Sequence, residues 1–371
     1  MNKRNSNMEL LRIVAMVMII VFHIFANSIN NQLTNIGPNS NEWYCQPYFS
    51  KKLCTLAVVS PMGQVGNTIF IIISGYFLAH KESIDLTKIS TKLLLQLGFA
   101  AIALGLMSIF VYLNKVQFFT ELISFNTFNW MSWYVGYYFV VIVIAKIFLN
   151  GFLRRLEKSG YVMFVIVMFA LVQFSWSSML ISNFGNGLEK VCTGVFLYSL
   201  GGYIRKYNPF RVIKLWGVAA IIVFMNIIVI GNFCISFANS ILEYNQSPEN
   251  MFTQSIPTYT TNQIIPIIIG IATFELFRRM KISNNRVVNF IGASTFMVYL
   301  IHDNVLFYKL WNSLDWMQLL HENVILFFGA YITQTSVTFA AGFLCYCVFV
   351  ISGKIFDYCK TLVIKQRSSV D

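Results

Sequence analysis

Long apolar stretches recur along the whole chain and constrain its fold more than any other feature of the sequence. A helix needs about 20 mainly apolar residues to cross the hydrocarbon core of a bilayer. Only 11% of the 371 residues are charged, against about 25% in a soluble globular domain, so the chain has too few charges to cover a soluble surface. We predict one all-α domain, residues 1–371, that forms an integral membrane bundle of about ten transmembrane helices. The predicted spans lie near 10–27, 60–79, 93–113, 131–152, 161–181, 188–204, 212–236, 262–278, 287–309 and 324–356.

Most basic residues lie on one side of this predicted topology. Of the 27 lysines and arginines, 21 are in the two termini and in the alternate loops around 80–92, 154–158, 205–214 and 278–286, while the opposite loops hold five. Cytoplasmic segments of membrane proteins carry the excess of Lys and Arg, so we expect both termini in the cytoplasm and a multi-pass protein of the cell (plasma or inner) membrane. The net charge of +12 comes in small clusters between apolar stretches, which argues against a nucleic-acid partner.

Four polar residues share one face of the first predicted span. Arg12 and His23 are eleven residues apart, which corresponds to nearly three full helical turns and to about 16 Å along the axis. Glu9 and Asn27 join this face at helical spacing. From this separation we expect Arg12 at the cytoplasmic edge and His23 beyond the middle of the membrane. Ionisable groups inside a span indicate a functional site. The alternative is that Arg12 reaches the headgroups and His23 bonds another helix.

The second predicted span contains small and polar residues on one face. Gly63, Asn67 and Ser74 follow one another at four- and seven-residue steps, a pattern that favours close helix packing over catalysis. Since no Gly-x-Ser-x-Gly motif surrounds Ser74, a serine hydrolase is not expected.

The ninth predicted span carries a polar stripe of its own. Thr295, Tyr299 and His302 lie on one face, with Asp303 and Asn304 alongside. His302 is either a second site residue, at a depth comparable to that of the first-span histidine, or a structural histidine that bonds a neighbouring helix. No His, Asp or Glu set shows the spacing of metal ligands, so no metal is expected.

Several other residues allow two interpretations each. The aromatic residues between 130 and 138 are typical of an interfacial belt, with the wall of a sugar site as the alternative. Cys45 and Cys54 share an outer loop and either form a disulfide or stay free thiols. His80 and His321 lie at span ends, where we expect them to meet water.

Three stretches of the sequence resemble the acyltransferase-3 family of multi-pass membrane O-acyltransferases. Glu9-Leu-Leu-Arg12, ten further residues and His23 resemble the Arg-x10-His pattern of the family's first helix. Residues 70–78 (Phe-Ile-Ile-Ile-Ser-Gly-Tyr-Phe-Leu) resemble its second segment, and residues 294–302 resemble its late Ser-x-x-x-Tyr-Leu-x-His segment. Phe-Ile stands at 70–71 where the family usually has Phe-Phe.

The resemblance implies transfer of an acyl group, usually acetyl, from cytoplasmic acyl-CoA to a hydroxyl of a cell-envelope glycan or its lipid-linked precursor. Arg12, with Glu9, would bind the donor, since guanidinium suits phosphate. His23 would act as general base or carry the acyl group as an acyl-imidazole, and we favour the base. Acyl-CoA is then a substrate and no permanently bound cofactor is expected. Possible supporting residues are Asn27, Asn67, Ser74, Tyr299 and His302.

Two other functions remain open at this point. The chain could be an exporter or carrier of a glycan intermediate or small solute, with His23, His302 and Asp303 as its polar lining. It could also be a non-catalytic partner of a glycan synthase. The sequence does not identify the acyl group, the acceptor hydroxyl or the oligomeric state.

Overall fold

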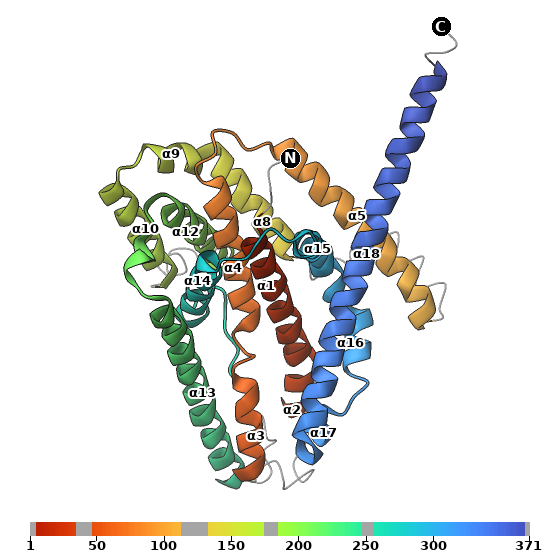
Figure 1. Cartoon of the computed structure of the whole chain (residues 1–371). Coiled ribbons are helices and arrows are strands. Elements are labelled where there is room, and N and C mark those ends of the chain that lie inside the picture. The colour runs from red at the N-terminus through yellow and green to blue at the C-terminus, as the bar shows by residue number, and fades with distance from the viewer. Residues whose placement is uncertain (1–4, 35–46, 113–132, 174–184, 247–255, 368–371) are drawn as a thin grey trace.

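A computed structural model describes residues 5–34, 47–112, 133–173, 185–246 and 256–367 (Figure 1), and every regular element in these ranges is a helix, which confirms the predicted all-α class. The elements are α1 (Ser6–Ile24), the π-helical turn η1 (Phe25–Ile29), α2 (Asn30–Thr34), α3 (Pro47–Ala57), α4 (Met62–Leu78), α5 (Leu86–Tyr112), α8 (Trp133–Ile144), the π-helical turn η3 (Ala145–Leu149), α9 (Asn150–Arg155), α10 (Lys158–Gln173), α12 (Gly185–Tyr207), the 3-10 turn η4 (Pro209–Val212), α13 (Leu215–Gln246), α14 (Ile264–Arg279), α15 (Arg286–His302), α16 (Val305–Trp311), α17 (Trp316–Glu322) and α18 (Val324–Arg367).

Six helical stretches in the described ranges are long and apolar enough to cross a membrane, or seven if one bent pair counts as a span. They cover 6–34, 48–78, 86–109, 133–155, 215–242 and 324–362, and the bent pair covers 286–322. The other predicted spans are also helices, but α10 and α14 have only 16 residues each and α12 carries charges at both ends. The chain is therefore a multi-pass membrane protein, while the count of ten stays a prediction.

The prediction of one continuous helix over 287–309 is wrong. Helix α15 ends at His302, and the chain turns by 85° before it continues in α16. Asn304 provides the physical reason, because its side-chain oxygen accepts the backbone N–H of Leu306 at 2.9 Å and so caps the start of α16. The Asn304 amide also donates to the carbonyl oxygen of Ile301, which would otherwise lack a helical partner.

The helices around the centre of the bundle approach one another closely. A Cβ on Gly75 of α4 would lie 1.9 Å from the carbonyl oxygen of Tyr198 in α12, and a Cβ on Gly292 of α15 would lie 2.5 Å from the carboxylate of Glu9 in α1. Only glycine permits these contacts between helix backbones. Gly63 likewise faces the ring of Phe22, so the small residues of the second span do serve close packing.

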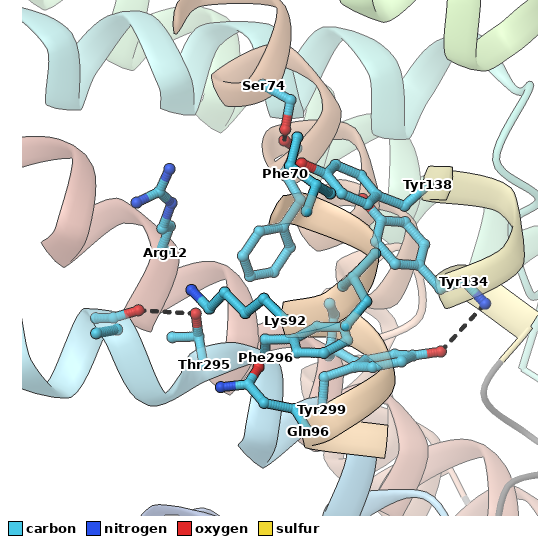
Figure 2. Close-up of a pocket in the computed structure, with 15 residues that line it drawn as sticks. Arg12, Phe70, Ser74, Lys92, Gln96, Tyr134, Tyr138, Thr295, Phe296 and Tyr299 are labelled. Atoms are coloured by element: carbon cyan, nitrogen blue, oxygen red, sulfur yellow. Dashed lines mark hydrogen bonds between the residues drawn. The ribbon is translucent and has the colours of Figure 1, made fainter. Parts of the chain in front are cut away.

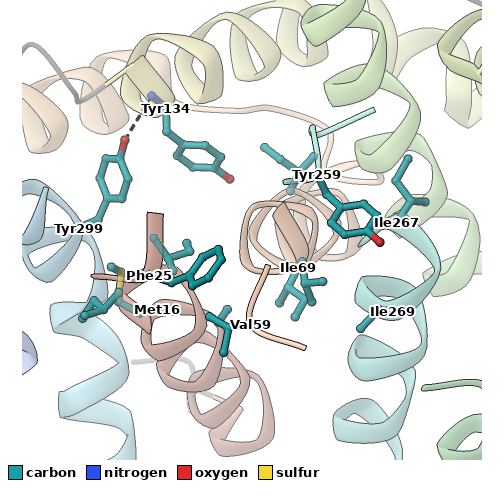
Figure 3. Close-up of a cluster of buried hydrophobic side chains, with 14 of the residues drawn as sticks. Met16, Phe25, Val59, Ile69, Tyr134, Tyr259, Ile267, Ile269 and Tyr299 are labelled. Carbon is teal, nitrogen blue, oxygen red and sulfur yellow. Dashed lines mark hydrogen bonds between the residues drawn. The ribbon is translucent and has the colours of Figure 1, made fainter. Parts of the chain in front are cut away.

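A buried apolar cluster fills the space between α1, α4 and α14 (Figure 3). Met16 of α1 and Phe25 of η1 contribute to it, together with Ile69 of α4 and Ile267 of α14, and all four side chains are buried. Tyr134 and Tyr299 border the cluster. The polar residues described below therefore lie beside a tightly packed apolar core that fixes the helices carrying them.

Segments that the charge count assigns to one side of the membrane contact one another. The Asn7 amide at the start of α1 donates to the carbonyl oxygen of Met280, and the Arg278 guanidinium donates to the Asn208 side chain at 2.5 Å. The start of α1 and the end of α18 lie toward the same end of the bundle (Figure 1). This arrangement agrees with an even number of crossings, and the side of the membrane that this end faces stays a prediction.

Candidate active site

Two histidines and a carboxylate from distant parts of the sequence meet where α15 ends. Nδ1 of His23 in α1 lies 2.9 Å from Oδ1 of Asp303, an ion-pair distance, although the ring N–H is not aligned well enough to form a hydrogen bond. The rings of His23 and His302 are 4.9 Å apart between centroids. Asp303 also accepts the hydroxyl of Tyr308 at 2.6 Å. The cluster therefore holds a carboxylate against one ring nitrogen of His23.

The hydrogen bonds of His302 fix its tautomer. Its Nδ1–H donates to the carbonyl oxygen of Tyr299 at 2.7 Å, because a carbonyl oxygen can only accept. The neutral ring then carries no hydrogen on Nε2, and this buried nitrogen has no hydrogen-bond partner in the described part of the chain. His302 is fully buried, whereas the His23 side chain keeps 20% of its surface exposed. His23 is therefore the histidine that a substrate can reach.

These three residues could also hold a divalent metal. His23, His302 and Asp303 each offer a ligand atom, and the three atoms lie within 4.8 Å of one another. Spacing along the sequence could not reveal this set, because His23 comes from α1 and the other two residues come from the end of α15 and the turn that follows it. Two imidazoles and a carboxylate suit zinc or iron. His23 and Asp303 already lie at an ion-pair distance of 2.9 Å from each other, and the absence of a metal stays a prediction.

A cavity of about 280 Å³ opens beside the first span, just below the usual range for small-molecule sites. Figure 2 shows the side chains that line it. Arg12 and Lys92 supply positive charge, and Ser74, Gln96 and Tyr138 supply further polar groups. Other lining residues are Ile19, Phe70, Ile89, Leu93, Tyr134, Gly292, Ala293, Thr295, Phe296 and Tyr299.

Arg12 is held in position by the neighbouring carboxylate. Its Nη1 donates to Oε1 of Glu9 at 2.7 Å, and the Glu9 side chain is almost fully buried against Gly292. Glu9 is not among the residues that line the cavity, while Arg12 is. Glu9 therefore orients the guanidinium, and the guanidinium itself faces the cavity.

Tyr299 separates the cavity from the histidine cluster. It lines the cavity, and its ring lies 5.4 Å from the ring of His302 between centroids. The backbone N–H of Tyr134 donates to its hydroxyl at 3.3 Å (Figure 2). His23 does not line the cavity, but Ile19, one helical turn before it, does. Arg12 thus lies at the cavity, and His23 lies farther along α1, beyond Ile19 and Tyr299.

Of the other residues that the sequence suggests for the site, one lines the cavity and two do not. Ser74 lines the cavity, and its hydroxyl donates to the carbonyl oxygen of Phe70 at 2.9 Å. Asn67 does not line it and instead donates to Gln64 at 3.1 Å. Asn27 lies in η1, where the π-helical turn changes the register after His23, so the prediction that it continues one regular face does not hold there.

Four further residues meet neighbours or lie outside the described ranges. His80 donates to the carbonyl oxygen of Gly202 at 2.9 Å, and His321 lies 2.6 Å from the hydroxyl of Tyr48, while both residues stay partly exposed. Cys45 and Trp130 lie outside the described residues, and the Cys45–Cys54 pairing is untested.

Sequence reasoning missed Lys92, Gln96 and the role of Asp303. Lys92 and Gln96 lie four residues apart on α5 and so share a helix face. That spacing could have identified both as candidate site residues, because an uncharged amide inside an apolar span is expected to have a polar partner. Asp303 was noted only as a neighbour of His302, since no sequence pattern reports a contact with α1.

The fold and the site define a multi-pass membrane protein with a polar site between its helices. The family model Acyl_transf_3, described as an acyltransferase domain, matches residues 5–355, and the chain belongs to this family. No curated protein and no solved structure gives a significant match. The predicted family is therefore confirmed over nearly the whole chain.

Proposed function

We propose that the protein is a membrane O-acyltransferase that moves an acyl group, in the simplest case acetyl, from cytoplasmic acyl-CoA to a hydroxyl of a cell-envelope glycan. The contact between Nδ1 of His23 and the Asp303 carboxylate carries this proposal. A carboxylate on one ring nitrogen orients the imidazole and stabilises its protonated form, and it leaves Nε2 to take up a proton. The acyltransferase family supports the reaction class.

The charged end of the cavity suits the donor. Arg12 and Lys92 both line it, and guanidinium and ammonium groups bind phosphate oxygens well. The volume of about 280 Å³ fits the narrow arm of acyl-CoA and leaves the nucleotide outside, beside the two cations. The basic residues at this end of the bundle agree with a cytoplasmic position for both termini and with entry of the anionic donor from that side.

The proposed reaction needs one proton relay at His23. Nε2 takes the proton of the acceptor hydroxyl as its oxygen attacks the thioester carbonyl carbon. The tetrahedral intermediate collapses, the carbon–sulfur bond breaks, and the CoA sulfur leaves with the proton that His23 received. Asp303 stabilises the positive ring between these two transfers. Tyr299 lines the cavity and contacts the ring of His302. The reaction forms one ester and one thiol with no further reactant.

Purified protein in liposomes tests the proposal. With labelled acetyl-CoA and an undecaprenyl-linked or polymeric glycan, we expect label in the glycan, and none with His23→Ala. His321→Ala is the matched control, because this histidine contacts Tyr48 and not Asp303, and the variant should transfer normally. Normal transfer by His23→Ala would overturn the assigned role. Movement of a glycan across the membrane without acylation would indicate a carrier instead.

A further inference from the structure

Gln96 presents an unusual combination of burial and missing hydrogen bonds. Its side chain is 1% exposed, and neither its amide nitrogen nor its amide oxygen has a hydrogen-bond partner in the described part of the chain. Burying an unpaired amide costs free energy that native structures normally avoid. A residue in this state is therefore expected to meet a polar group that arrives from outside the chain.

The cavity is where such a group would arrive. Gln96 lines it, one helical turn beyond Lys92 on the same face of α5 (Figure 2). The nearby hydroxyl of Thr295 already donates to the carbonyl oxygen of Gly292 at 2.9 Å, and that of Tyr299 accepts from Tyr134. These groups have partners of their own, so the amide of Gln96 is directed to a ligand in the cavity.

The chemistry of a carboxamide limits what that ligand can be. Gln96 offers N–H donors on its amide nitrogen and an acceptor on its amide oxygen. A ligand that pairs with both atoms must therefore carry an acceptor and a donor close together. A secondary amide carries both on opposite edges of its trans bond, so two neighbouring amides can supply the pair. The arm of acyl-CoA contains two of them, between the phosphates and the sulfur, and Arg12 and Lys92, which line the cavity, would hold those phosphates.

We propose that Gln96 is a binding site for the amide groups in the arm of the acyl donor, with Nε2 donating to an amide carbonyl and Oε1 accepting from an amide N–H. This inference rests on the proposed function and deepens it. Gln96 is a positioning residue that selects thioesters with an amide-containing arm. A thioester of equal length without amides leaves both polar atoms of Gln96 unpaired, and this penalty against the wrong donor is the source of selectivity.

Donor analogues and Gln96 variants test this together. Acetyl transfer in liposomes is measured with acetyl-CoA, with S-acetyl-N-acetylcysteamine, which has one amide, and with S-pentyl thioacetate, which has none. In Gln96→Leu we expect KM for acetyl-CoA to rise about tenfold, the size expected for two neutral hydrogen bonds, with kcat nearly unchanged. The preference for the cysteamine thioester over the pentyl thioester should fall to about one. The isosteric Gln96→Glu, which replaces the N–H donor by a second carboxylate oxygen and adds a negative charge when ionised, should be intermediate and keeps the test valid if the leucine variant folds poorly.

Gln334→Leu is the matched control. Its side-chain oxygen is also buried without a partner in the described ranges, but it lies on α18 and does not line the cavity, so donor preference should stay as in the wild type. If Gln96→Leu keeps the wild-type preference, Gln96 pairs only with water and the inference is overturned. If the wild-type protein transfers acetyl from none of the donors, the proposed function fails first and the inference with it. The two failures are therefore distinguishable.

Discussion

Replacing Asp303 by asparagine tests how much the carboxylate contributes to the proposed base. The variant keeps the shape of the side chain and an oxygen that can accept from Tyr308, so the fold around the end of α15 should survive. It removes the negative charge that lies 2.9 Å from Nδ1 of His23. The positive charge that develops on the ring during proton transfer then loses its partner.

The structure sets the size of the effect. Two unit charges 2.9 Å apart attract with about 6 kcal/mol at an effective dielectric constant of about 20. Because His23 is partly exposed and the asparagine keeps one oxygen, the attraction lost in the variant is about half of this, or about 3 kcal/mol. A barrier raised by this amount lowers kcat on the order of 100-fold. KM for the donor should change less than about twofold, because Asp303 does not line the cavity.

The assay is initial-rate acetyl transfer in liposomes at saturating and subsaturating acetyl-CoA. Tyr308→Phe separates the two contacts of Asp303, since it removes the hydrogen bond to the carboxylate and leaves its charge; we expect less than about a fivefold loss in kcat. Asp315→Asn, a helix-capping carboxylate on α17, controls for general effects of losing an acid. If Asp303→Asn keeps kcat within about threefold of the wild type, the carboxylate does not assist His23 and the mechanism is refuted.

Three further outcomes are expected. Arg12→Ala should raise KM for acetyl-CoA by about tenfold or more and weaken its dependence on salt, measured by rates at two ionic strengths. Gly292→Val should lower the thermal unfolding temperature, since its side chain meets a buried carboxylate 2.5 Å away, whereas Gly353→Val, with open space around it, should change it little. Mild copper-catalysed oxidation should join Cys54 to Cys234, whose sulfur atoms lie 3.4 Å apart, and peptide mass spectrometry would refute this by finding a different pair.

Helical periodicity predicted the first span well because both features it uses are local. The spacing of Arg12 and His23 fixes their common face as long as the helix is regular, and α1 is regular from Ser6 to Ile24. Asn27 falls just beyond, in a π-helical turn that the sequence does not signal. The same limit applies to the number of predicted membrane spans. Helix α14 ends in two arginines that pair with the buried Glu275, and its remaining apolar part is too short to be identified as a span from composition.

Contacts between helices decide the rest of the site, and no pattern within one helix reports them. The Arg12 side chain lies at the cavity because Glu9 holds it, and Glu9 is buried because α15 has a glycine at 292. Gln96 reaches the cavity because α5 packs beside α15. The sequence contained each of these residues but not the distances between them.

The break in the helix after His302 explains how two consecutive residues, 302 and 303, can both contact His23. Within a continuous helix, neighbouring side chains project about 100° apart, so residues 302 and 303 could not both face His23. In the structure α15 ends between them: Asp303 leaves the helical conformation, with φ −103° and ψ 81°, and Asn304 starts the next helix. The ring of His302 therefore lies beside that of His23 from within α15, while the Asp303 carboxylate reaches Nδ1 from the turn. Since the Asn304 side chain fixes both sides of this turn, the cap that interrupts the predicted span is also what assembles the proposed catalytic pair.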